Sequence, residues 1–495
     1  MIIKTDQSQI QSYLTDAANY KGFCEAVYFP ENESELTEIV KKANAEKKRI
    51  TVAGNGTGLT GARVPEGGIV IATDKLNKVS EINTDGKFVR VQAGVLMSEL
   101  KNLVAENNLF YPPDPTEQNC YIGATVATNA SGAKTFKYGP TRNFVTGLSV
   151  ILPDGEKIIL ERGRHFANGF DITLETVSGK KIKCKLPDYK MPETKHAAGY
   201  YCKKNMDLID LFIGSEGTLG IITQITLRLL PKPEEIISAV AFFREESDAL
   251  NFIAESRDLS YQSRKNNYEN NINAMGLEFF DKNSLDFLRP DFPNLPETSA
   301  AVWFEQDCTT ENKTTILEKW ISLLQKHNAD LEKSWIAENK TDEKSFHEFR
   351  HAVSSKVNEY ITQNNFRKIG TDTAVPDEEF YEFYYYSKQL VQESGIRFVI
   401  YGHFGNSHMH LNMLPENDVE FETAKKLYKK ILRNAVERKG TISAEHGIGK
   451  LKRDYLLEMF GEENIRKMAR LKKCLDPNLI LGIGNLFEEK FLTAK

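Results

Sequence analysis

Three histidines in one short stretch, His403, His408 and His410, give the clearest sign of chemistry in this chain, and Glu445 and His446 follow later. Imidazole nitrogens and carboxylate oxygens are ligands that divalent metal ions prefer in proteins. The sequence therefore predicts a metal site built from histidine and glutamate.

Local geometry can bring these histidines together. Side chains alternate along a strand, so His408, His410 and Asn412 would share one face. Residues 405–407, Gly-Asn-Ser, can turn the chain so that His403 joins them. Geometry alone leaves three histidines as candidate ligands.

Composition limits the classes of protein to consider. A length of 495 residues predicts two or three domains. The formal net charge of -5 argues against nucleic-acid binding, because no net positive field attracts phosphates. The N-terminal stretch is polar, and no apolar run is long enough to span a bilayer. We therefore expect a soluble, cytoplasmic protein without an export signal.

The cysteines are widely spread. No Cys-x-x-Cys pair occurs among the six, which are Cys24, Cys120, Cys184, Cys202, Cys308 and Cys474. This spacing favours separate, reduced thiols over a disulfide framework or a zinc site. We expect a reducing compartment.

The first half of the chain predicts an α+β body. Apolar periodicity indicates two helices, over residues 34–45 and 96–107. Short apolar or alternating runs predict strands over residues 49–53, 68–72, 88–93, 145–152, 156–160 and 221–230. Residues 162–201 show little periodicity, and we interpret them as an insertion or mobile flap, with disorder as the alternative.

After Pro231-Lys232-Pro233 the pattern changes to strand-then-helix units. One unit has a strand over 237–243 and a helix from 246, and the other has a strand over 300–305 and a helix over 311–328. These units predict a separate layer in which helices cover one face of an antiparallel sheet.

Glycine-rich loops follow several of the predicted strands. In residues 52–61, four glycines would let backbone N–H groups face an anion. The spacing differs from the dinucleotide fingerprint and from the nucleotide triphosphatase loop, and taken alone such a loop is more often a tight turn. Similar small-residue stretches occur at 112–116, 122–132, 137–142 and 214–223, and one extended cofactor could touch them all.

In these loops and in the histidine stretch, the chain resembles the FAD-linked oxidases of the vanillyl-alcohol-oxidase type. Within them it resembles the D-2-hydroxy-acid dehydrogenases, which include D-lactate and D-2-hydroxyglutarate dehydrogenases and the flavin subunit of glycolate oxidase. The resemblance covers roughly residues 26–487. It implies FAD- and metal-dependent oxidation of a D-2-hydroxy acid, such as D-lactate or glycolate, to the 2-oxo acid by hydride transfer to flavin.

The resemblance also implies the architecture. We expect a two-subdomain FAD-binding module over residues 1–232 and an antiparallel-sheet cap domain over 233–435. A C-terminal helical segment over 436–495 would return to the flavin.

The FAD contacts are likewise implied by the resemblance. The pyrophosphate would lie on Gly54, Asn55, Gly56, Thr57 and Gly58. The flavin would be lined by Pro113, Asp114, Gly123, Thr125, Asn129, Ser131 and Gly132, with Ile221 or Ile222 behind the adenine side. No histidine in these loops is placed to attach to the flavin, so we expect FAD to be bound non-covalently.

For the metal, the family pattern Gly-His-x-Gly-Asp-Gly-Asn-x-His-x-Asn implies His403, His410 and Glu445 as ligands of zinc, manganese or iron. His408 stands where the family often has asparagine, so we expect it beside the ligand set, with a fourth ligand as the alternative. Two histidines and one carboxylate leave positions open for a chelating 2-hydroxy acid. His446 would then take the hydroxyl proton as general base, with activity falling below a pKa of roughly 6 to 7.

Substrate contacts are implied at Arg350, Ser354 and Asn412. Arg350 resembles a family arginine that pairs with a substrate carboxylate, which gives it a catalytic role; the alternative is an arginine on a helix surface. Gly370 stands where several members have lysine, and Lys368 is two residues out of register. This difference weakens the case for a dicarboxylic substrate.

The ending of the chain also differs from the family, whose ending usually reads Asn-Pro-Gly-Lys. Gly482 and Asn485 replace its asparagine and lysine. The flavin contact made there is therefore expected to differ.

The electron acceptor is open, because no nicotinamide fingerprint occurs. A quinone, a cytochrome, a flavoprotein or an iron–sulfur protein would each serve. The alternative function is that of a flavin-bearing electron-transfer subunit of a larger complex. The lysine-rich run 424–431 leaves peripheral contact with the inner membrane face open, although such runs are more often solvated helix faces. A homodimer is also left open.

Overall fold

The computed structural model describes residues 1–364 and 366–493. Its N-terminal part begins with a four-stranded sheet in the order β1-β2-β4-β3. The members are β1 (Ile2–Lys4), β2 (Ala26–Phe29), β3 (Ile50–Ala53) and β4 (Ile69–Ala72), with helices α1 (Gln7–Ile10) and α2 (Glu33–Ala45). The α2 helix is capped by Asn32, whose side chain accepts a hydrogen bond from the Glu35 amide. Its residues Leu36 and Ile39 pack on the sheet.

A second sheet of five antiparallel strands follows, in the order β5-β6-β12-β8-β9. Its strands are β5 (Val79–Asn83), β6 (Phe88–Gln92), β8 (Val145–Ile151), β9 (Lys157–Glu161) and β12 (Ile221–Arg228). The associated helices are α3 (Met97–Glu106), α4 (Ile122–Thr128), α5 (Thr135–Tyr138) and α6 (Ile209–Phe212). A short pair, β7 (Leu109–Phe110) with β13 (Leu230–Pro231), leads to the cap.

Residues 162–201 contain regular structure, so the alternative of disorder was wrong, and their interpretation as an insertion or mobile flap stays a prediction. They contain an antiparallel hairpin of β10 (Asp171–Glu175) and β11 (Lys181–Lys185). Cys184 in β11 forms a disulfide with Cys474, which lies 290 residues later. The expectation of six reduced thiols was therefore also wrong, because cysteine spacing carries no information on pairs that only folding brings together. The other four cysteines are free and buried.

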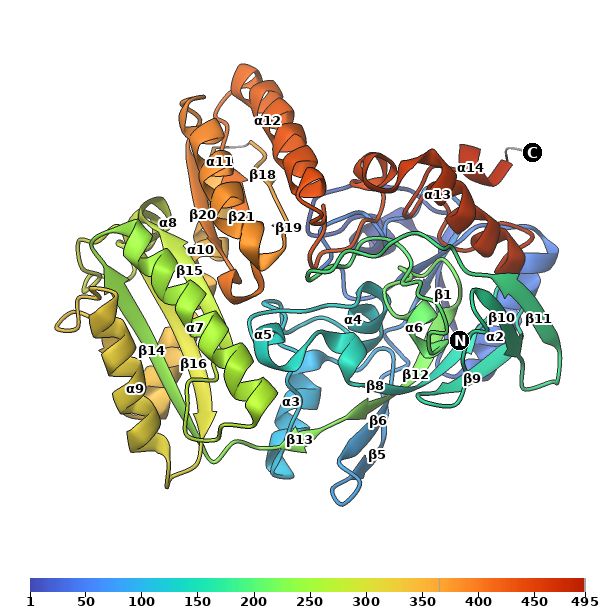
Figure 1. The fold of residues 1–495 in the computed structure, drawn as a ribbon. Coiled ribbons are helices and arrows are strands. Elements are labelled where there is room, and N and C mark those ends of the chain that lie inside the picture. Colours follow the sequence, from blue (N-terminus) through green and yellow to red (C-terminus); the bar gives the residue numbers. More distant parts are fainter. Residues whose placement is uncertain (365, 494–495) are drawn as a thin grey trace.

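The cap sheet is antiparallel throughout and has the order β17-β14-β16-β15-β20-β21-β18, with β19 also paired to β21. Its strands are β14 (Glu235–Phe243), β15 (Gly276–Asp281), β16 (Ala300–Cys308), β17 (Trp335–Ile336), β18 (Ile369–Gly370), β19 (Thr373–Ala374), β20 (Phe398–Gly402) and β21 (His408–Met413). It lies on the left of Figure 1, beside the N-terminal part.

Helices cover both faces of the cap sheet, and the one-face expectation was wrong. One face packs on α7 (Glu246–Asn266), α9 (Lys313–Lys326), α11 (Phe380–Gln392) and α12 (Asp418–Glu437). The other packs on α8 (Lys282–Leu288) and α10 (Lys340–Gln363). The reason is that both faces of β14 are apolar and must be covered. Ala239 and Ala241 belong to one core, whereas Val240 and Phe242 belong to the other.

The C-terminal helices return to the N-terminal part (Figure 1), and their return to the flavin stays a prediction. They are α13 (Arg453–Leu475), kinked at Gly461, and α14 (Lys490–Thr493). Ile465, Met468 and Leu471 of α13 share a core with the second sheet. With the two N-terminal sheets and the cap, this confirms the predicted α+β architecture.

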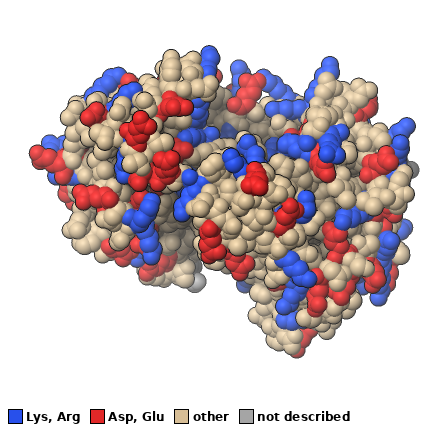
Figure 2. Space-filling model, turned by 90° about the horizontal axis from the view of Figure 1, so that it is seen from below, with Lys and Arg blue, Asp and Glu red and all other residues tan. Residues whose placement is uncertain are grey.

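The surface carries both acidic and basic side chains (Figure 2), in agreement with the composition of the chain. Seen from below, a recess lies between the two parts, with Lys and Arg side chains at its edge, and acidic and basic groups mix elsewhere on that face (Figure 2). In α12, Ala424, Leu427 and Ile431 are buried in the cap, whereas Lys425 and Lys426 are exposed. Within the described ranges, no helix has the length and apolar character needed to cross a bilayer.

Candidate active site

The histidine cluster forms as the residue pattern predicts. Strand β21 places His408 and His410 on one face, and the short turn over 404–406 brings His403 beside them. The ring centroids of His403 and His410 lie 5.6 Å apart, and those of His408 and His410 lie 4.4 Å apart. All three side chains are buried.

Glu445 faces two of these rings. Its Oε1 lies 3.2 Å from His403 Nε2 and 3.2 Å from His410 Nε2. Two atoms that each lie about 2.1 Å from one metal ion, at tetrahedral or octahedral angles, would be roughly 3.0 to 3.4 Å apart. The three side chains are thus spaced so that they could hold an ion.

The outer nitrogens of the two rings are already hydrogen-bonded. His403 Nδ1 lies 2.6 Å from Glu278 Oε1, and His410 Nδ1 donates to the Thr371 carbonyl at 3.2 Å. Such bonds direct the Nε2 lone pairs inward. Burial opposes a charge on His403, but Glu278 and Glu445 raise its pKa overall. A cation bound between the rings would supply the positive charge that these carboxylates favour.

His408 is engaged differently. Its Nε2 donates to Asp372 Oδ1 at 3.0 Å, and its Nδ1 lies 3.1 Å from Lys195 Nζ. Its nearest ring nitrogen is within 4.8 Å of the atoms that could bind metal, so spacing alone would admit it as a ligand. Because both nitrogens already have partners, the geometry supports a place beside the ligand set.

Lys195 comes from the segment that was interpreted as a flap. Its Nζ donates to Glu445 Oε2 at 2.9 Å, and its side chain is only 5% exposed. With burial opposing the charge on Glu445, Lys195 and His403 hold the pKa of that carboxyl well below its usual range. No spacing signal in the sequence could have linked residue 195 to this site.

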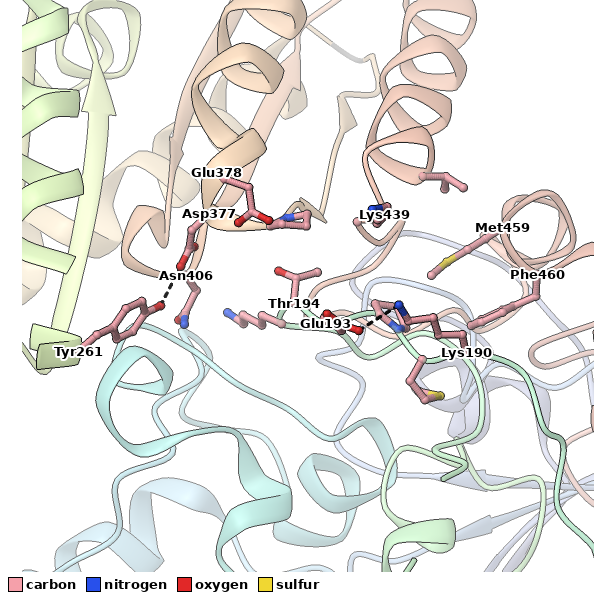
Figure 3. Close-up of a pocket in the computed structure, with 16 residues that line it drawn as sticks. Lys190, Glu193, Thr194, Tyr261, Asp377, Glu378, Asn406, Lys439, Met459 and Phe460 are labelled. Atoms are coloured by element: carbon pink, nitrogen blue, oxygen red, sulfur yellow. Dashed lines mark hydrogen bonds and ion pairs between the residues drawn. The ribbon is translucent and has the colours of Figure 1, made fainter. Parts of the chain in front are cut away.

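Lys195 also lines a cavity of about 660 Å³ between residues 190–195, the cap and α13. Figure 3 shows Tyr261 and Asp377 on one side of it and Lys190 and Phe460 on the other. Lys195 is thus the residue that lines this cavity and also contacts Glu445.

Asp372 is a second residue that sequence reasoning missed. Besides His408, it accepts hydrogen bonds from the backbone amides of Glu445 at 3.2 Å and His446 at 3.0 Å, and from Lys452 Nζ at 2.8 Å. Its burial raises its pKa, but His446 and Lys452 lower it well below the usual range. This carboxylate fixes the loop that carries Glu445.

His446 lies next to the cluster, with its ring stacked on His410 at 5.3 Å. Its Nδ1 lies 3.4 Å from Asp372 Oδ2, and its Nε2 lies 3.7 Å from Glu445 Oε1. Burial lowers the pKa of His446 to about 4, outweighing the two carboxylates. Burial thus favours the neutral imidazole that a general base needs, and the expected fall of activity below a pKa of roughly 6 to 7 stays a prediction.

Arg350, on α10, is buried, so the alternative of a helix-surface arginine was wrong. Its Nε lies 3.6 Å from Glu278 Oε2, and its guanidinium lies 5.3 Å from the centre of the Trp303 ring. Through Glu278 it is connected to His403. Ser354 and Asn412 meet at the Tyr401 hydroxyl, whose pKa is raised by burial.

The loops expected to bind FAD gather beside this site. Among the described residues, no protein acceptor lies opposite the backbone N–H groups of residues 54–58, and a Cβ on Gly58 would meet no atom within 4 Å. The loop is therefore free to face a phosphate. A Cβ on Gly54 would lie 3.1 Å from the Ala124 side chain, which places this loop next to α4.

The expected flavin-lining residues lie around α4 and are largely buried: Pro113, Asp114, Gly123, Thr125, Asn129, Ser131 and Gly132. Asn129 ends α4 in the left-handed conformation, and a Cβ on Gly132 would lie 1.8 Å from the Asp114 carbonyl oxygen. Ser131 Oγ donates to Glu445 Oε2 at 3.2 Å, which joins this wall to the histidine cluster. Ile221 and Ile222 are buried in two different cores.

Family comparison agrees with this arrangement. Residues 232–486 match the family described as "FAD linked oxidases, C-terminal domain", and residues 24–161 match the one described as "FAD binding domain". A D-lactate dehydrogenase of Anaerostipes hadrus is 31% identical over 462 residues, which are 91% of this chain and 87% of the relative.

Two other similar proteins carry related names. Glycolate oxidase subunit GlcD of Bacillus subtilis (strain 168) is 29% identical, covering 96% of this chain and 92% of the relative. A D-2-hydroxyglutarate dehydrogenase of Stutzerimonas stutzeri (strain A1501) is 26% identical, covering 98% and 96%. A solved alkyldihydroxyacetonephosphate synthase shares the fold, with a TM-score of 0.65 at 15% identity over 97% of this chain and 82% of that chain.

Proposed function

Since this chain belongs to the family of FAD-linked oxidases, we propose that it oxidises a small D-2-hydroxy acid to the 2-oxo acid with non-covalent FAD and a divalent metal. The chain is an FAD-linked oxidoreductase. The observation that carries the finer proposal is the convergence of His403 Nε2 and His410 Nε2 on Glu445 Oε1, beside Ser131 of the flavin wall.

Two observations support the proposed substrate class: the names of the relatives and the glycine at position 370. The names of the relatives give lactate, glycolate and hydroxyglutarate, all small 2-hydroxy acids. Gly370 pairs with Asn412 across β18 and β21, and a Cβ there would lie 2.3 Å from Asn412 Oδ1. Since this chain has glycine where several family members have lysine, we propose a monocarboxylic acid such as D-lactate or glycolate.

The chain has residues suited to hold both proposed groups, FAD and a divalent metal. Residues 54–58 would receive the FAD pyrophosphate on free backbone N–H groups, and His403, His410 and Glu445 would hold zinc, manganese or iron. When bound, FAD would accept the hydride from the α-carbon, and the metal would lower the pKa of the α-hydroxyl.

His446 would remove the hydroxyl proton. Its Nδ1 is directed at Asp372 Oδ2, so Nε2 is the nitrogen left to accept a proton. Asp372 would then stabilise the imidazolium, as a buried carboxylate does for a catalytic histidine. Arg350, Ser354 and Asn412 would orient the substrate on the cap side, with Arg350 acting on its carboxylate.

The alternative is a flavin-bearing subunit that works only inside a larger complex. It is favoured by one observation, that the relative from Bacillus subtilis is named as a subunit. A quinone, a cytochrome, a flavoprotein or an iron–sulfur protein could then accept the electrons.

Purified single chain, assayed with an artificial dye and a panel of D- and L-2-hydroxy acids, tests the proposal. We expect dye reduction with a D- or achiral acid and little with the L-enantiomer. Flavin that is reduced by substrate but never passes electrons to the dye would instead favour the subunit alternative. Flavin that no 2-hydroxy acid reduces would contradict the proposed substrate class.

A further inference from the structure

We propose that Glu216, in the loop between α6 and β12, is a positioning residue that holds residues 445–449 against the glycine loops of the N-terminal part. Those residues include Glu445 and His446, so the inference rests on the proposed function for its catalytic meaning. It concerns a buried carboxylate that the proposed reaction does not use.

The carboxylate of Glu216 accepts two neighbouring backbone amides. Its Oε1 accepts from Ile448 at 2.7 Å and its Oε2 accepts from Gly449 at 2.6 Å. The residue is 5% exposed and adopts a φ of 51°, which side-chain-bearing residues rarely do. A strained, buried acid whose two oxygens both bind one loop is suited to fixing that loop.

The loop itself has the shape that this contact requires. Gly447 has a φ of +78°, and a Cβ there would lie 2.9 Å from Glu216 Oε1. Gly449 has a φ of +51°, and a Cβ there would lie 2.1 Å from the Thr60 carbonyl oxygen. Glycine at both positions allows the loop to pass between Glu216 and the 54–61 loop.

Glu216 is in turn fixed to the proposed flavin wall. Its amide donates to the Ala127 carbonyl in α4 at 2.9 Å. Its carbonyl accepts from Asn485 Nδ2 at 3.1 Å, and Asn485 Oδ1 accepts from Lys450 Nζ at 2.8 Å. One residue therefore connects α4, the C-terminal segment and the loop that carries Glu445 and His446.

Burial of the Glu216 carboxyl group costs free energy that a turn without a buried acid would not cost. It raises the pKa of Glu216 to about 7, although the two amides and the lysines at 450 and 452 act in the opposite direction. An unpaired buried acid is unfavourable. The bonds to Ile448 and Gly449 account for its presence.

The test is Glu216→Gln, which keeps the shape but places an amide N–H against a backbone N–H. Asp476→Asn is the matched control, because Asp476 is also buried and accepts the amides of Ile480 at 3.2 Å and Leu481 at 2.9 Å. Hydrogen exchange by mass spectrometry, on the FAD-loaded protein, would follow peptides that cover 443–451 and 477–484.

We expect Glu216→Gln to speed exchange in 443–451 by roughly tenfold or more, as loss of a charge-assisted hydrogen bond implies. Asp476→Asn should change 477–484 and the end of α13 around Lys472, whose Nζ also donates to Asp476, but not 443–451. Titration with zinc should show weaker binding in Glu216→Gln and wild-type binding in Asp476→Asn, even if both lose similar thermal stability.

Unchanged exchange in 443–451 would overturn the positioning role, whatever the activity. If wild type binds no zinc, the proposed metal site fails while the exchange result still decides on Glu216. If Glu216→Gln does not fold, Glu216→Asp, whose side chain is one methylene shorter, should give the same exchange signature, and its absence would overturn the inference.

Discussion

Lys195 Nζ lies 2.9 Å from Glu445 Oε2, so a lysine of the N-terminal part contacts the proposed metal ligand, which belongs to the C-terminal segment. Since Lys195 is the largest influence that lowers the pKa of Glu445 against its burial, Lys195→Met should raise that pKa. Glu445 would then take up a proton, and release metal, at a higher pH.

The measurement is metal content after dialysis over a pH series. The midpoint for metal loss should move to higher pH in Lys195→Met than in wild type. Lys439→Met is the control, because Lys439 lines the same cavity. An unchanged midpoint in Lys195→Met would show that this lysine does not act on Glu445.

We expect His410 to be a metal ligand and His408 not to be one. His410→Asn removes an Nε2 atom that faces Glu445 Oε1, and we expect loss of the metal. His408→Asn removes bonds to Asp372 and Lys195, and we expect metal to be retained. Metal analysis of both purified variants checks this, and metal loss from His408→Asn would make His408 a fourth ligand.

His446 and Glu445 are neighbours with different proposed roles. His446→Asn should keep FAD and metal but slow flavin reduction roughly 10² to 10⁴-fold, the usual contribution of a general base. Glu445→Gln should lose the metal instead. Stopped-flow reduction with D-lactate measures the first effect, and an unchanged rate in His446→Asn would assign proton removal to another group.

Stability should depend on pH through His196. Its Nδ1 is buried and has no hydrogen-bond partner among the described residues, and burial together with Arg142 lowers its pKa from 6.5 to about 3. The folded state thus binds fewer protons than the unfolded state between these values. Stability is full above pH 6.5 and falls as the pH drops toward 3.

His196→Phe keeps a ring to stack on Tyr201 but cannot titrate. Between about pH 7 and pH 5, wild type should lose roughly 1 to 2 kcal/mol more unfolding free energy than this variant. Urea titrations at the two pH values give the comparison. Equal losses in both proteins would mean that His196 does not contribute.

Local patterns predicted the parts of this molecule that depend on neighbours in sequence. Alternation along β21 and the turn over 404–406 were enough to assemble the three histidines. Periodicity predicted α2, for which residues 34–45 were expected and Glu33–Ala45 is found. The glycine loops around α4 were also predicted as one group.

Residues that act across long separations were missed. Lys195 and Glu445 are 250 residues apart, and Cys184 and Cys474 are 290 apart. A buried lysine or carboxylate interacts with a partner that only folding brings close. Neither the residue type nor the spacing in the chain identifies that partner. Asp372 was likewise invisible, because its partners belong to β21 and to the loop before α13.

The most direct test of the account is anaerobic reduction of the bound flavin by D-lactate or glycolate, before and after chelation. We expect the yellow colour to bleach in metal-replete protein, to persist after chelation while FAD stays bound, and to bleach again when zinc or manganese is returned. Bleaching at the full rate in verified metal-free protein would contradict the proposed role of His403, His410 and Glu445. Metal-replete flavin that no D-2-hydroxy acid reduces would contradict the proposed reaction itself.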